Sequence, residues 1–130
     1  MATPIETVVT ECTQGSDQER ITFPEVVGKL MAAGVERYRA DLIRSEKVYY
    51  MPDGTTVVTP AHETPQPAVA FSAPGVEAAV RAIQSGAIKY REFCARIAAA
   101  GCVDYLVSIT GACAIYYGRT GACHIEPFPK

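Results

Sequence analysis

Apolar residues recur three or four positions apart in two segments of the chain, the spacing of an amphipathic helix. The positions are Phe23, Val26, Val27, Leu30 and Met31 in the first segment and Tyr90, Phe93, Cys94, Ile97 and Ala98 in the second. Thr22, Pro24 and Glu25 form a capping box with proline in the first turn, which predicts where the first helix begins. Gly34 and Gly101 stand where a left-handed residue ends each helix.

After each glycine the hydrophobic period changes from helical spacing to two, which predicts a strand. Tyr38, Ala40 and Leu42 alternate with polar residues, and Tyr105, Val107 and Ile109 occupy the same positions in the second segment. The segments MPDGT (51–55) and GRTGA (118–122) then predict three-residue hairpin loops closed by glycine. These loops would pair Met51 with Thr55 and Gly118 with Ala122.

The two segments align without a gap at an offset of 67 residues, 21–60 over 88–127. Ten positions are identical, among them both glycines that end the helices, Tyr49/Tyr116 and Tyr50/Tyr117. A tandem duplication explains this match. We predict an α+β fold over a single domain, 1–130, in which two helix-then-antiparallel-strand modules place their helices on one side of the sheet.

The remaining segments predict smaller elements. Residues 6–16 and 73–86 read as helices that precede the repeats, and AVAFS (68–72) reads as a short strand. The proline-rich linker 59–67 should cross the surface.

The hairpin register predicts which face each residue of the second hairpin occupies. We expect Cys113, Ile115, Tyr117, Cys123 and Ile125 to face the core, with Ala114, Tyr116, His124 and Glu126 on the opposite side. Val48, Tyr50, Thr56 and Val58 take the matching inner positions of the first module. The sequence TGAC occurs twice, at 110–113 and 120–123, and both of its thiols would then lie in an apolar stripe.

The segment Phe23–Asp41, the following EKVYYMPDG and the later YREFCARIAAAGCVDYLV resemble the YdfO and YbcV-like proteins, a bacterial family often encoded in prophages and classified as a domain of unknown function. The resemblance covers about residues 20–127. It implies the same small α+β fold, and the family supplies no established catalytic residues.

Composition narrows the classes of function. A net charge of −2 without a basic run gives no sign of nucleic-acid binding. The uncharged stretch 105–118 is shorter than the ~20 residues of a membrane helix, and we expect neither a signal peptide nor a membrane segment. Five cysteines without a C-x-x-C pair indicate reduced thiols, hence a cytoplasmic protein.

Candidate catalytic and metal-binding groups are few. Only His62 and His124 could join cysteines in a zinc site, and His124 should point away from its neighbour Cys123 in a strand. We therefore predict no catalytic residues, no metal and no cofactor.

A ligand-binding surface is the more informative hypothesis. Arg39, Asp41, Lys47 and Tyr49 should share the sheet face away from the helices, where guanidinium and tyrosine groups can hold an anionic or aromatic ligand. The full candidate set is Arg39, Asp41, Lys47, Tyr49, His62, Tyr116 and His124. The alternative, which we favour, is a solvated face of weak ion pairs.

Three classes of function stay open. The first is a non-enzymatic domain that binds a small molecule or a protein partner between the modules. The second is an enzyme with a small-molecule site in that cleft. The third is a phage-associated structural protein that acts through oligomer contacts, such as those of a homodimer.

Overall fold

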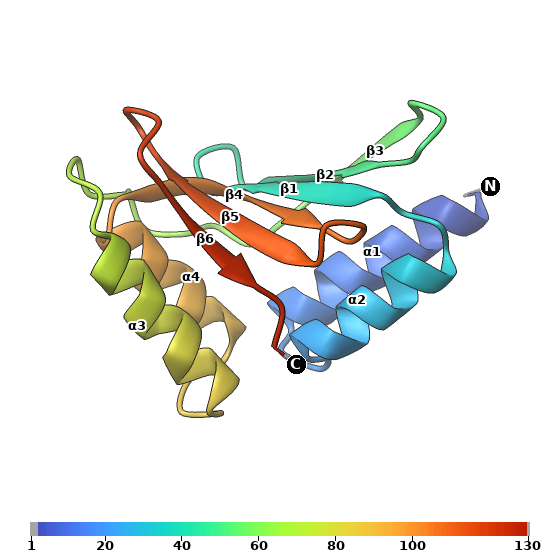
Figure 1. Ribbon diagram of the computed structural model, residues 1–130. Coiled ribbons are helices and arrows are strands. Elements are labelled where there is room, and N and C mark those ends of the chain that lie inside the picture. The colour runs from blue at the N-terminus through green and yellow to red at the C-terminus, as the bar shows by residue number, and fades with distance from the viewer. Residues whose placement is uncertain (1–2, 130) are drawn as a thin grey trace.

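The computed structural model describes residues 3–129 as four helices and a six-stranded antiparallel sheet (Figure 1). The first half contains α1 (Pro4–Asp17), α2 (Phe23–Ala32), β1 (Arg37–Asp41), β2 (Glu46–Tyr50) and β3 (Thr56–Pro60). The second half contains α3 (Ala73–Gln84), α4 (Tyr90–Ala99), β4 (Cys102–Ser108), β5 (Cys113–Gly118) and β6 (Cys123–Pro127). The predicted α+β class is confirmed.

The predicted helix signals lie at the ends of the observed helices. The Thr22 N–H donates to Glu25 Oε1 over 3.0 Å at the start of α2, as a capping box requires. Gly34 and Gly101 follow α2 and α4 with φ of 82° and 89°, in the left-handed region. The helix predicted over residues 6–16 is observed as α1, which runs for 14 residues and is capped by Thr3.

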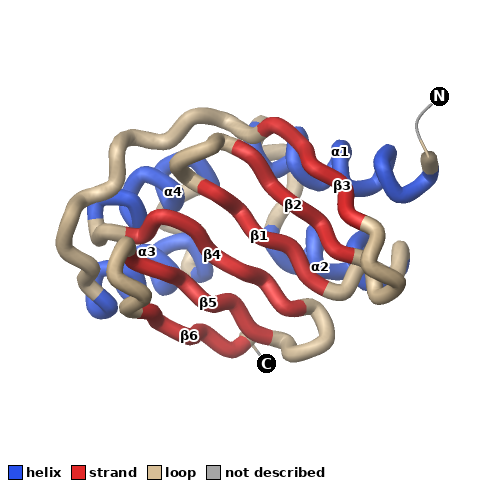
Figure 2. Tube along the Cα trace, turned by 90° about the horizontal axis from the view of Figure 1, so that it is seen from above, coloured by secondary structure: helices blue, strands red, loops and turns tan. Residues whose placement is uncertain are grey.

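The sheet has the order β3-β2-β1-β4-β5-β6, so the two halves join where β1 pairs with β4 (Figure 2). The register pairs Arg37 with Ser108 at one end and Asp41 with Asp104 at the other. Its middle pair, Arg39 and Leu106, is separated by 106 − 39 = 67 residues, the offset of the sequence repeat. A two-fold axis through this pair therefore exchanges equivalent positions of the two central strands.

Both predicted hairpin loops are confirmed. The Met51 N–H donates to the Thr55 carbonyl over 2.8 Å, and the Gly118 N–H donates to the Ala122 carbonyl over 2.7 Å. The glycines of the loops, Gly54 and Gly121, have φ of 91° and 89°, which explains the choice of glycine there.

The prediction of which residues in the outer hairpins face the core is wrong, because the side chains of β2, β3, β5 and β6 alternate in the opposite sense. The helices lie below the sheet in Figure 1 and behind it in Figure 2. The buried positions of the strands are Tyr38, Ala40, Lys47, Tyr49 and Thr59 in the first half and Cys102, Tyr105, Val107, Ala114, Tyr116, Gly118 and Glu126 in the second. The residues predicted to be inside are Cys113, Ile115, Tyr117, Cys123 and Ile125, and they lie on the opposite face.

The pairing with β1 sets this alternation. The alternation of β1 is unambiguous, and its buried Tyr38 and Ala40 stand opposite Tyr49 and Lys47 of β2. Directly paired residues share a face, so Lys47 and Tyr49 must follow β1 inward.

The strand predicted at 68–72 is also wrong. This segment runs beside the end of α4, where the Ala68 and Ser72 N–H groups donate to the carbonyls of Ala98 and Ala100. Its backbone passes directly over Gly101, where a β-carbon would meet the Ala70 carbonyl. Among residues 3–129, no helix is long and apolar enough to cross a membrane.

Candidate functional site

The buried side chains occupy one face of the sheet, and we call the opposite face the outer face. Side chains on the outer face form three rows that run across the strands. The central row contains Val58, Val48, Arg39, Leu106, Ile115 and Ile125. The Arg37 row contains Thr56, Tyr50, Arg37, Ser108, Cys113 and Pro127. The Asp104 row contains Pro60, Glu46, Asp41, Asp104, Tyr117 and Cys123.

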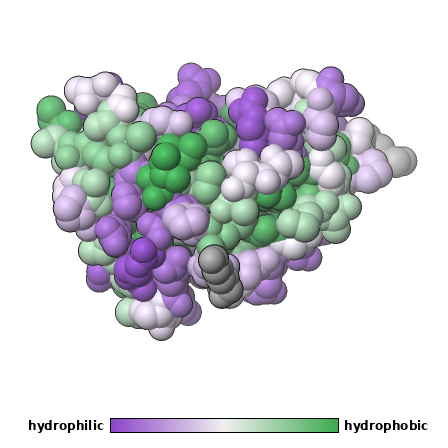
Figure 3. Space-filling model, viewed as in Figure 1, coloured by the Kyte–Doolittle hydropathy of each residue, from purple (hydrophilic) through white to green (hydrophobic). Residues whose placement is uncertain are grey.

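The central row crosses the whole sheet and is aliphatic at every strand except β1. Val58 and Ile125, on the two edge strands, are 57% and 59% exposed, and the four residues between them are half-buried. Figure 3 shows one end of the apolar surface, where hydrophobic residues gather over β5 and β6.

Two arginines of β1, Arg39 in the central row and Arg37 in the row beside it, pack against tyrosine rings of the flanking rows. The Arg37 guanidinium lies over the Tyr50 ring at 3.9 Å, and Arg39 lies 5.5 Å from the Tyr117 ring. Arg39 also donates from Nη1 to Asp104 Oδ1 over 2.8 Å. Partial burial raises the pKa of Asp104, and the nearby Arg39 opposes that shift.

Asp41, a predicted ligand residue on this face, has a structural role in the turn after β1. Its Oδ1 accepts hydrogen bonds of 3.0 Å from the N–H groups of Ile43 and Arg44. This is the arrangement by which an aspartate closes a tight turn.

Lys47 and Tyr49 do not lie on the outer face, which corrects their predicted position. Lys47 is only 3% exposed, and its Nζ lies 4.7 Å from the Tyr90 ring and 5.8 Å from the Tyr38 ring. It forms no salt bridge within the described residues 3–129. Desolvation therefore lowers the pKa of Lys47.

Tyr49 is held by a buried hydroxyl network. Its hydroxyl is 2.8 Å from Thr13 Oγ1, which is in turn 2.7 Å from Thr59 Oγ1. Burial raises the pKa of Tyr49. The network joins α1 to β2 and β3, a structural role that satisfies all three hydroxyls.

His62 lies between the two halves of the chain. Its backbone N–H donates to Asp17 Oδ2 over 3.0 Å, and its Nδ1 is 2.7 Å from Asp17 Oδ1. The His62 ring meets the Tyr90 ring edge-on at 5.6 Å, and its buried Nε2 has no hydrogen-bond partner among the described residues. Arg91 of α4 donates to the Asp17 carbonyl over 2.7 Å, so this group of residues connects α1 with α4.

Tyr116 and His124 lie on the inner face of the second half, in separate surroundings. The Tyr116 ring packs against Phe93 and Tyr105 in the core. His124 Nε2 is 2.8 Å from Glu126 Oε2, and Arg81 donates to the other carboxylate oxygen over 2.6 Å. Although burial opposes the shift, these two contacts lower the pKa of Glu126.

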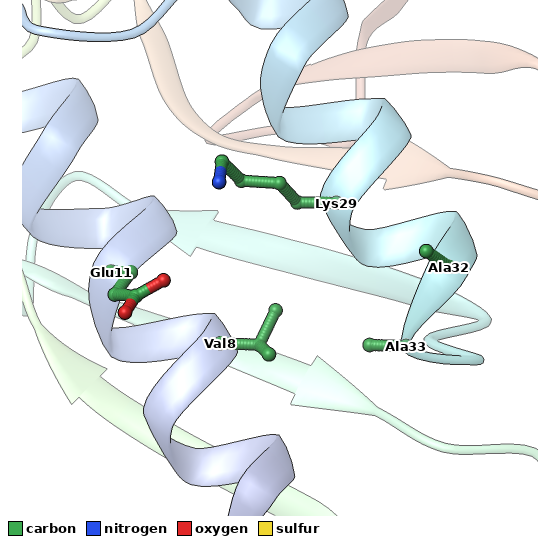
Figure 4. A pocket seen from close by; sticks show the side chains of 5 residues that line it. All are labelled: Val8, Glu11, Lys29, Ala32 and Ala33. Carbon is green, nitrogen blue, oxygen red and sulfur yellow. The ribbon is translucent and has the colours of Figure 1, made fainter.

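A shallow groove opens between α1 and α2 (Figure 4). One part, of about 410 Å³, is lined by Pro4, Ile5, Val8 and Ala33, and a second part of about 280 Å³ shares Val8 and Ala33. Figure 4 shows Val8 and Ala33 pointing toward one another, with Glu11 and Lys29 further along the two helices. The groove contains none of the predicted site residues.

The five thiols are unpaired and differ in exposure: Cys12, Cys94 and Cys102 are buried, Cys113 is half-buried and Cys123 is exposed. Within residues 3–129, no three histidine, cysteine or acidic side chains come close enough to hold a metal ion.

The model of a family described as "Protein of unknown function (DUF1398)" matches residues 18–126. The chain therefore belongs to the DUF1398 family. Comparison with curated proteins finds no significant match.

The DUF1398 match begins at the residue after α1 ends, and it covers the first repeat, the first five strands and all but the last residue of the second repeat and of β6. Asp17, the partner of His62, thus lies immediately outside the matched segment. The contact between His62 and Asp17 therefore joins a residue inside the segment that the family model matches to a residue outside it.

The predicted ligand residues of this DUF1398 chain do not come together in one place. Arg39 and Asp41 share the outer face, whereas Lys47 and Tyr49 of β2 are buried on the inner face. His62 lies between the two halves of the chain, and Tyr116 and His124 lie on the inner face of the second half. Sequence reasoning missed Asp17, Tyr90 and Asp104, which contact His62, Lys47 and Arg39. Of these, Asp104 could have been found, because it occupies the position equivalent to Arg37 in the repeat.

Proposed function

We propose that this DUF1398 chain is a non-enzymatic protein-interaction domain that binds its partner through the outer face. The exposed central row carries the proposal, since Val58 and Ile125 at its ends are more than half exposed. Contiguous apolar side chains on an open surface are typical of interaction sites. Covering them removes apolar area from water, which is the main favourable contribution to protein association.

The burial of the inner polar groups favours a protein partner over a small ligand. Lys47 and Tyr49 of β2 are buried between the sheet and the helices, and Tyr105 is equally buried with its hydroxyl 2.6 Å from that of Tyr90. A small molecule would have to displace these contacts to reach any of the three side chains. The outer face requires no such rearrangement.

An affinity-capture experiment with two matched variants tests the proposal. Ile125→Glu places a charge in the central row, while Met31→Glu places the same charge on α2 at a side chain that is equally exposed, 59% in both cases. The proposal predicts that a protein retained by the wild type is retained by Met31→Glu and lost by Ile125→Glu. Equal retention by all three forms would contradict it.

An enzyme with a small-molecule site between the two halves is the second candidate. The observation that favours it is the buried His62 Nε2, which has no partner within residues 3–129 although Nδ1 is fixed by Asp17. A histidine oriented by a carboxylate is suited to transfer protons. A compound that raises the melting temperature of the wild type and leaves that of His62→Gln unchanged would support this candidate.

We also propose how the chain arose, how it is organised and where in the cell it acts. A tandem duplication is supported by the 67-residue offset, which extends to α1 and α3, where Val9 and Cys12 occupy buried positions equivalent to Val76 and Ala79. The sequence motifs fit a single domain, a relationship to the YdfO and YbcV-like proteins and a prophage origin. Free thiols suit a cytoplasmic location.

A further inference from the structure

We propose that the partner of the outer face is a second copy of the chain, related to the first by a two-fold axis that runs along the central row. This inference rests on the proposed function, because it assigns an occupant to the same surface. Four features of the outer face support it: the continuity of the central row, the charges of the two flanking rows, the direction of the Arg39 side chain and the size of the face.

The central row is able to pack against itself. A two-fold axis along the row brings each strand of one copy opposite the same strand of the other, so Val58 meets Val58 and Ile125 meets Ile125. Residues of this row are aliphatic on five of the six strands, and the contact is therefore apolar at every strand except β1. Two antiparallel sheets packed face to face in this way form an ordinary sandwich.

The charges of the two flanking rows are complementary under the same axis, because it places the Arg37 row of one copy over the Asp104 row of the other. The Asp104 row carries the three carboxylates Glu46, Asp41 and Asp104, whereas the other row contains Arg37 and no acidic residue. Arg37 of each copy then stands over Asp41 of its partner. The pairing occurs twice in the dimer, as a symmetric interface requires.

Arg39 is the only charged residue of the central row, and its side chain is directed away from the axis. Its guanidinium is bound to Asp104 at 2.8 Å and lies near the Tyr117 ring, both in the Asp104 row. The Asp104 rows of the two copies lie on opposite sides of the axis. The two guanidinium groups therefore diverge, and each keeps its own carboxylate partner.

An axis along the strands would be unfavourable. It would place the Asp104 row of one copy over the Asp104 row of the other, so that Asp41 of each copy faced Asp104 of its partner. Like charges opposite one another across an interface oppose association. The charges thus select the axis along the central row.

The size of the face sets the expected strength. Six strands spaced about 4.8 Å apart, each with about five residues at about 3.3 Å, give a footprint near 400 Å² before side-chain relief is counted. Stable interfaces bury about 800 Å² per partner. We expect reversible association in the micromolar range, with a monomer that remains folded.

Sedimentation velocity of the full chain from about 1 µM to about 1 mM tests self-association. We expect the wild type and Met31→Glu to shift together from monomer to dimer, and Ile125→Glu to weaken the dimer at least about tenfold. Ile125 is exposed in the monomer, so a loss of folding would not explain the difference, and circular dichroism checks this. A wild type that stays monomeric at every concentration, or a dimer that Ile125→Glu leaves intact, would overturn the inference.

Chemical cross-linking tests the direction of the axis. In a background of Cys113→Ser and Cys123→Ser, single Val58→Cys and Ile125→Cys variants are treated with a bismaleimide that spans about 10 Å, the distance between packed sheets. We expect each variant to cross-link to itself. Cross-links that form only when the two variants are mixed would place the axis along the strands and refute the proposed dimer.

The two proposals can fail separately. A chain that is monomeric throughout and still captures another protein in a manner abolished by Ile125→Glu would refute the second copy as partner and leave the outer face as the interaction surface. Capture that Ile125→Glu does not alter would refute the proposed function itself.

Discussion

Replacing the buried Lys47 with methionine should make the protein more stable. Lys47 is only 3% exposed, its Nζ forms no salt bridge within residues 3–129, and two tyrosine rings lie near it at 4.7 Å and 5.8 Å. Asp17 attracts the ammonium from beyond salt-bridge distance, but desolvation is the larger effect. Methionine retains a flexible side chain of similar length and removes the charge. The substitution therefore removes a desolvation cost while it keeps most of the packing.

The magnitude follows from two limits. A desolvated ammonium costs several kcal/mol, and desolvated cation–π contacts recover about 2 kcal/mol each. The cost at pH 7 cannot exceed that of releasing the proton, about 5 kcal/mol for a group with an ordinary pKa of 10.5. We expect Lys47→Met to raise the free energy of unfolding by about 1–3 kcal/mol, or the melting temperature by about 4–12 °C.

The pH dependence separates the charge from packing. Because burial lowers the pKa of Lys47, the unfolded chain binds the proton more tightly than the folded chain between the lowered pKa and 10.5. Wild-type stability must rise with pH through that window relative to the variant. The advantage of Lys47→Met should be largest near pH 7 and shrink as the pH approaches 10.5.

Urea denaturation at about pH 7 and about pH 9.5 measures both effects. Lys29→Met serves as the control, since Lys29 is exposed on α2 and its replacement should change stability little. A Lys47→Met variant that is less stable than the wild type would refute the reasoning. A gain of the same size at both pH values would show that packing, and not the buried charge, is responsible.

Substitutions at three further positions test the contact between the two halves and the backbone at the ends of α2 and α4. Asp17→Ala should lower the free energy of unfolding by about 2–4 kcal/mol, because Asp17 accepts two hydrogen bonds from His62. Asp17→Asn should lower it by about half as much. Equal stability of the wild type and both variants would contradict this. Gly34→Ala should cost about 1–2 kcal/mol for its positive φ, whereas the equivalent Gly101→Ala should cost at least about 3 kcal/mol because a β-carbon there meets the Ala70 carbonyl. Thermal denaturation distinguishes these two glycines, and equal losses would show that the backbone contact with Ala70 is not important.

Local sequence patterns were sufficient for the helices and turns and insufficient for the faces of the outer strands. The capping box at Thr22 and the glycine-closed loops act over a few residues, so each can be recognised alone. The strand EKVYY has Val48 and Tyr50 on one face and Lys47 and Tyr49 on the other, and both sets include an apolar residue. Only the pairing of Lys47 with Ala40 decides which set is buried.

The candidate site could be predicted only in part for a related reason. Arg39 and Asp41 were recognised from the alternation within their own strand, and both lie on the outer face. His62 and Asp17 are separated by 45 residues and meet only after the linker crosses the end of α1. Lys47 approaches Tyr90 across the two halves of the chain, and the repeat gives no signal for that contact because Ala114 replaces the lysine in the second half.

Thiol modification of the outer face tests the central claim most directly, because Cys123 is a native exposed thiol in the Asp104 row. Burial raises the pKa of Cys94 to about 11 and that of Cys102 to about 12, so these thiols serve as unreactive references. Maleimide labelling followed by mass spectrometry should find Cys123 reactive in dilute protein and protected as the chain concentration rises, with protection lost in Ile125→Glu. A labelling rate at Cys123 that does not depend on concentration would contradict the account of the outer face as a self-association surface.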